Sequence, residues 1–204
     1  MTARNDDIGD PVPHLIPSRV IGGSAVVATQ IYIVPERRPA RPGPWTFEAD
    51  RLAWVDGNTG MHCVILRAER GGHLCGYVGV EIGHPLFGWD HRDIPPGLGV
   101  HVHGGIGYSD LSDEDGPEAV AVRQLRIGDV DDPRWWFGFS CDQPSDLLPG
   151  AAAGGDDYRG AQPVGAVYRG EDYLLGQCTA LAFRLMAVAT ALEALLAEPP
   201  TPRR

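Results

Sequence analysis

The sequence predicts an α+β domain in which a mixed or antiparallel β-sheet is covered by a long C-terminal helix. Apolar runs separated by glycine-rich turns fill most of residues 60–140, which is typical of short strands. The segment Glu171–Glu198 instead repeats leucines at alternating spacings of four and three, as an amphipathic helix does. Strands followed by one long helix favour an architecture in which the helix packs on one face of the sheet.

The length of 204 residues fits one domain. Residues 1–18 are polar and rich in proline, so we expect a flexible N-terminal arm there. Pro199–Pro200 ends the helical pattern. The sequence therefore predicts an arm at 1–18, a single α+β domain at 19–198 and a tail at 199–204.

The N-terminal part of this domain mixes extended and aromatic stretches. Its pattern predicts a strand at Val20–Val34, an extended linker at Pro35–Pro44, and a short helix at Trp45–Val55. Next, Met61–Arg67 and His73–Glu81 predict a hairpin, because the intervening ERGG is a turn signal.

Three further strands are predicted before the helix. They are Gly99–Tyr108, Ala119–Ile127 and the strongly aromatic Arg134–Ser140. The acidic stretch Asp110–Glu118 and residues 144–160 are predicted loops. The leucine stripe of the last helix can cover the sheet. Alternatively, two copies of the chain could form a homodimer through this stripe.

Composition excludes several classes of function. The net charge of −10 disfavours a nucleic-acid partner, because phosphate neutralisation needs a basic surface. All 17 basic residues are arginine, which excludes a P-loop lysine and a Schiff-base lysine. No apolar run approaches the ~20 residues of a membrane span, so no membrane partner is expected.

The chain is expected to be cytoplasmic. Its first residues, MTARNDDIGDPVP, lack the basic and apolar regions of a signal peptide. The four cysteines form no C-x-x-C pair and are interpreted as free thiols in a reducing compartment.

One segment, His73–Tyr108, concentrates the residues that build sites. It holds five of the seven histidines, nine glycines and one cysteine. Glycine permits positive φ and close approach of a ligand, and histidine titrates or binds metal near neutral pH. We therefore place the functional site in or beside this segment.

The runs CGYVGVEIGHPLFG, VHVHGG, WWFGFSCD and YRGEDYLLGQC resemble a family of small phage and bacterial proteins known as uncharacterised. The resemblance covers Trp45 to Cys178 and implies a phage or prophage-like setting, without an established activity. Two departures matter. His101 precedes His103, and Gln143 stands where the family often carries a histidine, which weakens a metal site built on Cys141.

The interpretation we favour is a protein that binds a small polar ligand, with a nucleotide-like molecule as one candidate by analogy. Glycines would open a groove with aromatic walls, and histidine with an aspartate would supply polar contacts. The residues predicted to line it are Tyr77, His84, Gly104, Gly105, Trp135 and Trp136.

A first alternative is a hydrolase or transferase. It takes Cys75 as the thiolate nucleophile, His103 as the base and Asp142 as the group that orients the base. Asp146 also follows the aromatic strand and offers a carboxylate. The competing interpretation is that Cys75, inside a strand, is a small core residue.

A second alternative is a metal-binding protein. His101 and His103 form an H-x-H pair on the predicted strand, to be completed by His84, Asp142 or Cys75. No organic cofactor is expected, and a divalent metal is the one cofactor that this pair admits.

Overall fold

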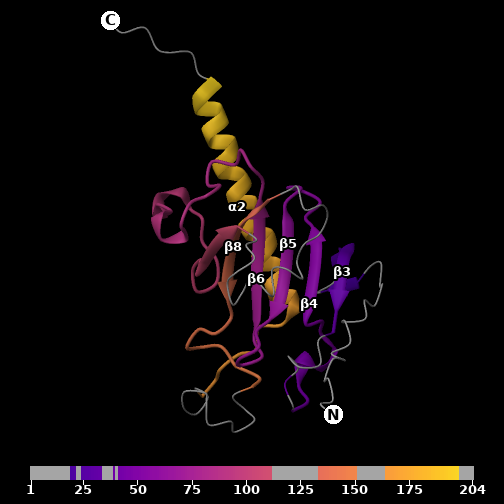
Figure 1. Cartoon of the computed structure of the whole chain (residues 1–204). Coiled ribbons are helices and arrows are strands. Elements are labelled where there is room, and N and C mark those ends of the chain that lie inside the picture. Colours follow the sequence, from indigo (N-terminus) through magenta and orange to yellow (C-terminus); the bar gives the residue numbers. More distant parts are fainter. Residues whose placement is uncertain are drawn as a thin grey trace, which may run out of the picture.

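The structure is a computed structural model, and it describes residues 19–21, 24–33, 39, 41–111, 133–150 and 164–197. Six strands in these ranges form one antiparallel sheet in the order β3-β4-β5-β6-β8-β7. Figure 1 shows the single long helix α2 lying against this sheet, so the predicted α+β fold is confirmed. The strands of the sheet are β3 (Ala28–Tyr32), β4 (Arg51–Val55), β5 (His62–Arg67), β6 (Leu74–Val80), β7 (Tyr108–Leu111) and β8 (Trp135–Ser140). Two short strands, β1 (Arg19–Ile21) and β2 (Ser24–Val26), pair with each other in a separate ribbon.

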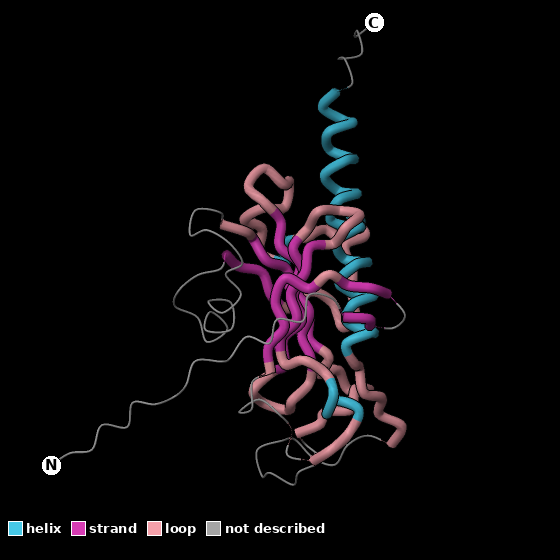
Figure 2. The backbone as a smooth tube through the Cα atoms, turned by 90° about the vertical axis from the view of Figure 1, so that its right-hand side faces the viewer, coloured by secondary structure: helices cyan, strands magenta, loops and turns pink. Residues whose placement is uncertain are grey.

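Helix α2 spans Glu171–Ala197, within one residue of the range that leucine periodicity predicts. Its first half carries the stripe Leu174, Cys178, Leu181 and Leu185, all fully buried. Its last turns extend beyond the sheet in both views (Figures 1 and 2), and Leu195 there is 69% exposed. The stripe therefore packs on the sheet only as far as the sheet reaches.

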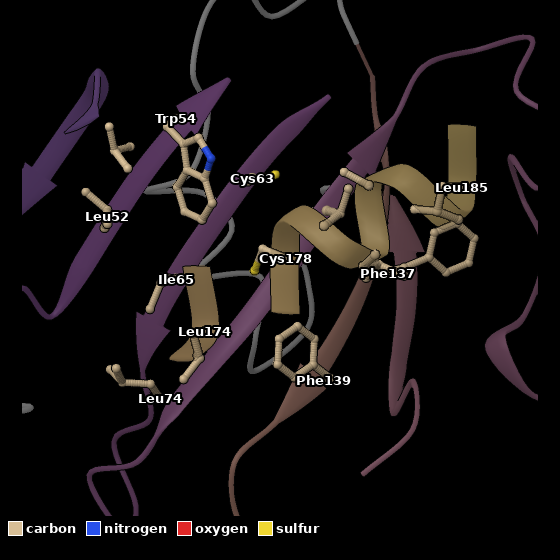
Figure 3. Close-up of a cluster of buried hydrophobic side chains, with 14 of the residues drawn as sticks. Leu52, Trp54, Cys63, Ile65, Leu74, Phe137, Phe139, Leu174, Cys178 and Leu185 are labelled. Atoms are coloured by element: carbon tan, nitrogen blue, oxygen red, sulfur yellow. The ribbon is translucent and has the colours of Figure 1, made fainter. Parts of the chain in front are cut away.

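The two faces of the sheet bury different side chains. On the helix side, alternate residues of the strands meet α2 in one apolar cluster (Figure 3), which includes Leu52, Trp54, Cys63, Ile65, Leu74, Phe137, Phe139, Leu174, Cys178 and Leu185. On the opposite side, a smaller cluster contains Ala53, Val64, Leu66, Tyr77 and Trp136. Gly76 allows the helix to approach, because a Cβ there would lie 2.4 Å from the Phe139 ring and 2.8 Å from the Cys178 sulfur.

A buried ionic cluster fixes the start of α2. The side chain of Arg67 is fully buried and contacts Asp50 at 2.7 Å and Glu48 at 3.1 Å. Glu48 in turn accepts the backbone N–H of Glu171 at 3.1 Å and the hydroxyl of Tyr168. These contacts hold residues 168–171 against the sheet, and so they position the side chains that follow on the first turns of the helix.

Three predicted elements were wrong. Val20–Val34 is not one strand, because its described part is divided among β1, β2 and β3, and the first two of these pair with each other outside the main sheet. Trp45–Val55 is not a helix: it contains part of a short 3₁₀ turn (Pro44–Phe47), and Arg51–Val55 is β4, paired on both sides. Gly99–Tyr108 is not a strand, because Gly99, Gly104 and Gly105 adopt φ of 68°, 69° and 89°, which interrupts a ladder. Only Tyr108 belongs to a strand, as the first residue of β7.

Some predictions lie outside the described residues. These are the arm at 1–18, the strand Ala119–Ile127, most of the acidic loop Asp110–Glu118, residues 151–160 of the later loop and the tail at 199–204. Among the described residues, α2 is long and apolar enough to cross a membrane by length and composition alone, a criterion that core helices of soluble proteins also meet. The expected absence of a membrane partner, the cytoplasmic location and the homodimer through α2 stay predictions.

Candidate functional site

A group of polar side chains in mutual contact gathers beside the first two turns of α2. We call His103, Cys141, Asp146, Arg169 and Tyr173 the His103 cluster. His103 comes from the glycine-rich segment after β6, Cys141 follows β8, and Tyr173 lies on α2. A parallel bridge between Asp146 and Val167 brings the turn after β8 beside the segment that enters the helix.

His103 is held on three sides. Its backbone N–H donates to Gln177 Oε1 at 3.0 Å, which ties the glycine-rich segment to α2. Its ring Nε2 lies 2.6 Å from Asp146 Oδ2, and Nδ1 lies 3.0 Å from the hydroxyl of Tyr173. The side chain is 11% exposed, so the ring borders solvent without being open to it.

Asp146 is the most buried charge of the cluster. Its side chain has no exposed surface, and besides His103 it accepts the backbone N–H of Gln143 at 3.0 Å and Nε of Arg169 at 3.0 Å. An ionised carboxylate only accepts hydrogen bonds, so Nε2 of His103 carries a proton. In the neutral ring, Nδ1 then accepts the proton of the Tyr173 hydroxyl. The result is a relay from Tyr173 through His103 to Asp146.

Cys141 is buried next to this relay. A nitrogen of His103, the sulfur of Cys141 and an oxygen of Asp146 all lie within 4.8 Å of one another. Burial raises the pKa of the Cys141 thiol well above its usual range, and the nearby Asp146 carboxylate raises it further. Cys141 is therefore a neutral thiol at pH 7 unless a cation stabilises the thiolate.

Arg169 forms the outer edge of the cluster. Its Nε binds Asp146 Oδ1, and its guanidinium carbon lies 4.6 Å from the centre of the Tyr173 ring. The side chain is one-quarter exposed. Among the described residues, the hydrogen bonds of Arg169 use Nε, which leaves the two terminal nitrogens at the rim.

One glycine of the predicted groove borders the cluster. A Cβ at Gly104 would lie 2.4 Å from the side-chain nitrogen of Gln143 and would displace that side chain, and the φ of 69° also favours glycine. Gly105 also has a positive φ, but no described atom lies within 4 Å of the position that a Cβ would take there.

The predicted nucleophile Cys75 lies elsewhere. It packs with Tyr77 on the sheet face opposite α2, whereas His103 contacts α2 itself. The Cys75 sulfur lies 3.5 Å from the Ser140 hydroxyl, which lies 2.9 Å from Nε2 of buried His73. The structure thus does not bring Cys75 and His103 together.

Asp142 and His101 are also outside the cluster. Asp142 is exposed and accepts a hydrogen bond from Gln143 at 3.3 Å, while Asp146 occupies the position expected for the orienting carboxylate. His101 is exposed, so the H-x-H pair does not converge on one point. Only His103 of that pair reaches other possible metal ligands.

The remaining predicted residues lie apart from the His103 cluster. His84 donates from Nε2 to the carbonyl of Leu185 at 3.0 Å and accepts the N–H of Leu86 at Nδ1, so it fastens a loop to α2. Trp136 is buried on the face opposite α2, and Trp135 donates to the carbonyl of Trp89 at 3.0 Å. These tryptophans do not wall the His103 cluster.

A cleft of about 540 Å³ lies apart from the cluster, between the loop after β6 and the distal half of α2. It is lined by Met61, Gly79, Ile82, His84, Leu192 and Leu196 among others. None of the residues that line it belongs to the His103 cluster. We keep it as the alternative place for a ligand.

Sequence reasoning missed Tyr173 and Arg169 as site residues. Arg169 precedes α2 by two residues and Tyr173 lies on its first turn, and the guanidinium carbon of Arg169 lies 4.6 Å from the centre of the Tyr173 ring. The signal available was the run YRGEDY, in which polar aromatic and charged residues precede the apolar stripe.

Comparison with known proteins gives no further guidance, because no family model, curated protein or solved structure matches the chain. The family resemblance described above therefore stays an expectation.

Proposed function

We propose that the chain binds a small polar ligand with an anionic group, a carboxylate or a phosphate, at the His103 cluster. The observation that carries the proposal is Arg169, whose Nε is fixed by Asp146 at 3.0 Å while its side chain is one-quarter exposed and its terminal nitrogens make no hydrogen bond to a described residue. A guanidinium oriented in this way presents a planar pair of donors, which suits bidentate recognition of an oxyanion.

The surrounding groups support polar recognition. Tyr173 lies beside Arg169 and contacts His103, and the backbone amide of Gln143 and the side-chain amide of Gln177 contact the same cluster. Asp146 is held by three donors before any ligand arrives, so the ligand need not order these side chains itself. Preorganised donors reduce the entropy lost on binding.

A titration with defined anions tests the proposal. The probes are inorganic phosphate, succinate and adenosine monophosphate, added to the purified full chain and followed by calorimetry. Arg169→Gln should weaken the best binder by about tenfold or more, the usual effect of losing a charged hydrogen bond. The matched control is Arg184→Gln, at a position on α2 outside the cluster, which should bind as the unmodified chain does. Absence of saturable binding to all three probes, or equal loss in both variants, would contradict the proposal.

A second candidate is acid–base catalysis in a hydrolase or transferase. The observation that favours it is the relay, in which a hydroxyl, an imidazole and a carboxylate are hydrogen-bonded in that order at 3.0 and 2.6 Å. This is the arrangement of a catalytic triad with Tyr173 in the place of the nucleophile. Turnover of a nitrophenyl ester or phosphate that Tyr173→Phe abolishes, with anion binding retained, would make this candidate the leading one.

A further inference from the structure

We infer that the His103 cluster is also a site for one divalent ion of zinc type, held by His103, Cys141 and Asp146. The inference concerns the same place as the proposed anion site, but it depends on different atoms. Arg169 carries the anion proposal, whereas the imidazole, the thiol and the carboxylate carry the metal.

The geometry is within reach of a tetrahedral site. Zinc bonds of about 2.0–2.3 Å place neighbouring ligand atoms about 3.3–3.6 Å apart in a tetrahedron. The three candidate atoms already lie within 4.8 Å of one another, and two of them, Nε2 and Oδ2, are 2.6 Å apart. Opening this last distance by about 0.7 Å and bringing the sulfur closer needs only small side-chain rotations.

The set of donors selects the class of metal. A thiolate and an imidazole favour zinc and its neighbours over magnesium or calcium, which prefer oxygen ligands. Cys141 is buried beside His103 and Asp146, and a zinc ion bound there would displace its thiol proton and hold the thiolate. A buried thiol, a buried carboxylate and a half-buried imidazole then acquire a common partner.

The groups around the three ligands fit the inference. With the ion on Nε2, Nδ1 of His103 would donate to the Tyr173 hydroxyl that lies 3.0 Å away. Asp146 would keep its hydrogen bonds from Arg169 and from the backbone of Gln143. Such outer hydrogen bonds fix the orientation of metal ligands and raise their affinity.

Three protein ligands leave a fourth position on the ion, as in catalytic zinc sites. Among the described residues, the cluster offers no fourth histidine, cysteine or acidic ligand. Arg169 contacts Asp146, one of the three ligands, so an anion held by Arg169 would lie close enough to the ion to complete the coordination. This last step rests on the proposed function.

Cobalt substitution tests the metal directly. Protein treated with EDTA and desalted is given one equivalent of Co²⁺ at pH 7.5, and its absorption spectrum is recorded. We expect a near-ultraviolet thiolate-to-cobalt charge-transfer band, strong visible bands of a tetrahedral ion, and loss of both when Zn²⁺ is added. Cys141→Ser should remove the charge-transfer band, and His103→Gln should weaken zinc binding by about tenfold or more.

The controls are Cys75→Ser and His101→Gln, which should leave the spectrum and the affinity unchanged. Equilibrium dialysis with Zn²⁺ should give close to one ion per chain. A wild-type spectrum without a sulfur band, or zinc binding that survives both Cys141→Ser and His103→Gln, overturns the inference. The wild-type spectrum decides the matter even where a variant does not fold.

The anion titration on the EDTA-treated protein separates this inference from the proposed function. Anion binding without stoichiometric zinc binding would overturn the metal inference and support the proposed function. The opposite result is stoichiometric zinc binding with no anion binding in either the metal-free or the zinc-loaded protein. It would support the metal inference and contradict the proposed function.

Discussion

The sharpest test of the fold concerns Arg67, because its removal affects the support of the functional site as well as stability. Its guanidinium has no exposed surface and reaches five groups, namely Asp50, Glu48, the hydroxyl of Tyr168 and the carbonyls of Gly72 and Ala49. Replacing it by methionine keeps much of the volume and removes the charge that faces the fully buried Asp50 side chain.

Breaking a buried ion pair by removing one partner costs about 3–5 kcal/mol. Arg67→Met should reduce the free energy of unfolding by this amount, a large share of the roughly 5–15 kcal/mol of a typical domain. With a urea m-value of about 2 kcal/mol/M, the midpoint should fall by about 1.5–2.5 M. Tryptophan fluorescence during urea unfolding measures it.

Two variants control this measurement. Arg70→Met removes an exposed arginine three residues along and should change stability by less than about 0.5 kcal/mol. Arg67→Met with Asp50→Asn removes both charges. It should recover part of the loss, because the double variant has no carboxylate facing the uncharged methionine. A loss below about 1 kcal/mol in Arg67→Met, or no recovery in the double variant, would refute the importance of the buried pair.

Three other predictions concern the helix and the loop that it holds. Leu181→Ala truncates a fully buried side chain and should lower the free energy of unfolding by about 2–5 kcal/mol. Leu195→Ala, at an exposed position, should change it by less than about 0.5 kcal/mol. Equal effects of the two variants would refute the assignment of the stripe. Gly76→Ala should lower stability by about 1–3 kcal/mol, since its methyl would overlap the Phe139 ring; a neutral thermal melt would contradict this close packing. Burial lowers the pKa of His84, so the unfolded chain binds a proton below pH ~6.5 that the folded chain resists. The free energy of unfolding should therefore fall as the pH drops below about 6.5, and it should fall less steeply in His84→Gln. Urea unfolding at a series of pH values measures it, and the same dependence on pH in both proteins would contradict the prediction.

Periodicity made most of the fold predictable. The leucine spacing identified α2 almost to the residue, and alternating apolar runs identified β5, β6 and β8. Trp45–Val55 failed because pairing of β4 with two neighbours outweighs a locally ambiguous pattern. Gly99–Tyr108 failed because positive φ at three glycines breaks the extended run that its sequence suggests.

The candidate site was predictable only in part. His103 could be named from its place before a glycine pair, but which carboxylate it meets depends on the irregular turn after β8. That turn buries Asp146 and exposes Asp142 four residues earlier. Alternation correctly placed Cys75 with Tyr77 on one face of β6, yet it could not show that His103 approaches from the other face. Such long-range contacts are set by the packing of α2.

The central claim is that ligand recognition takes place at the His103 cluster and not in the cleft near His84. Backbone amide chemical shifts of the isotope-labelled chain, recorded while phosphate is added, test it most directly. The account predicts saturable shifts concentrated at Gly104, Gln143, Arg169 and Tyr173, all absent in Arg169→Gln. The largest shifts at Gly83, His84 and Leu192, or none that saturate, would contradict it.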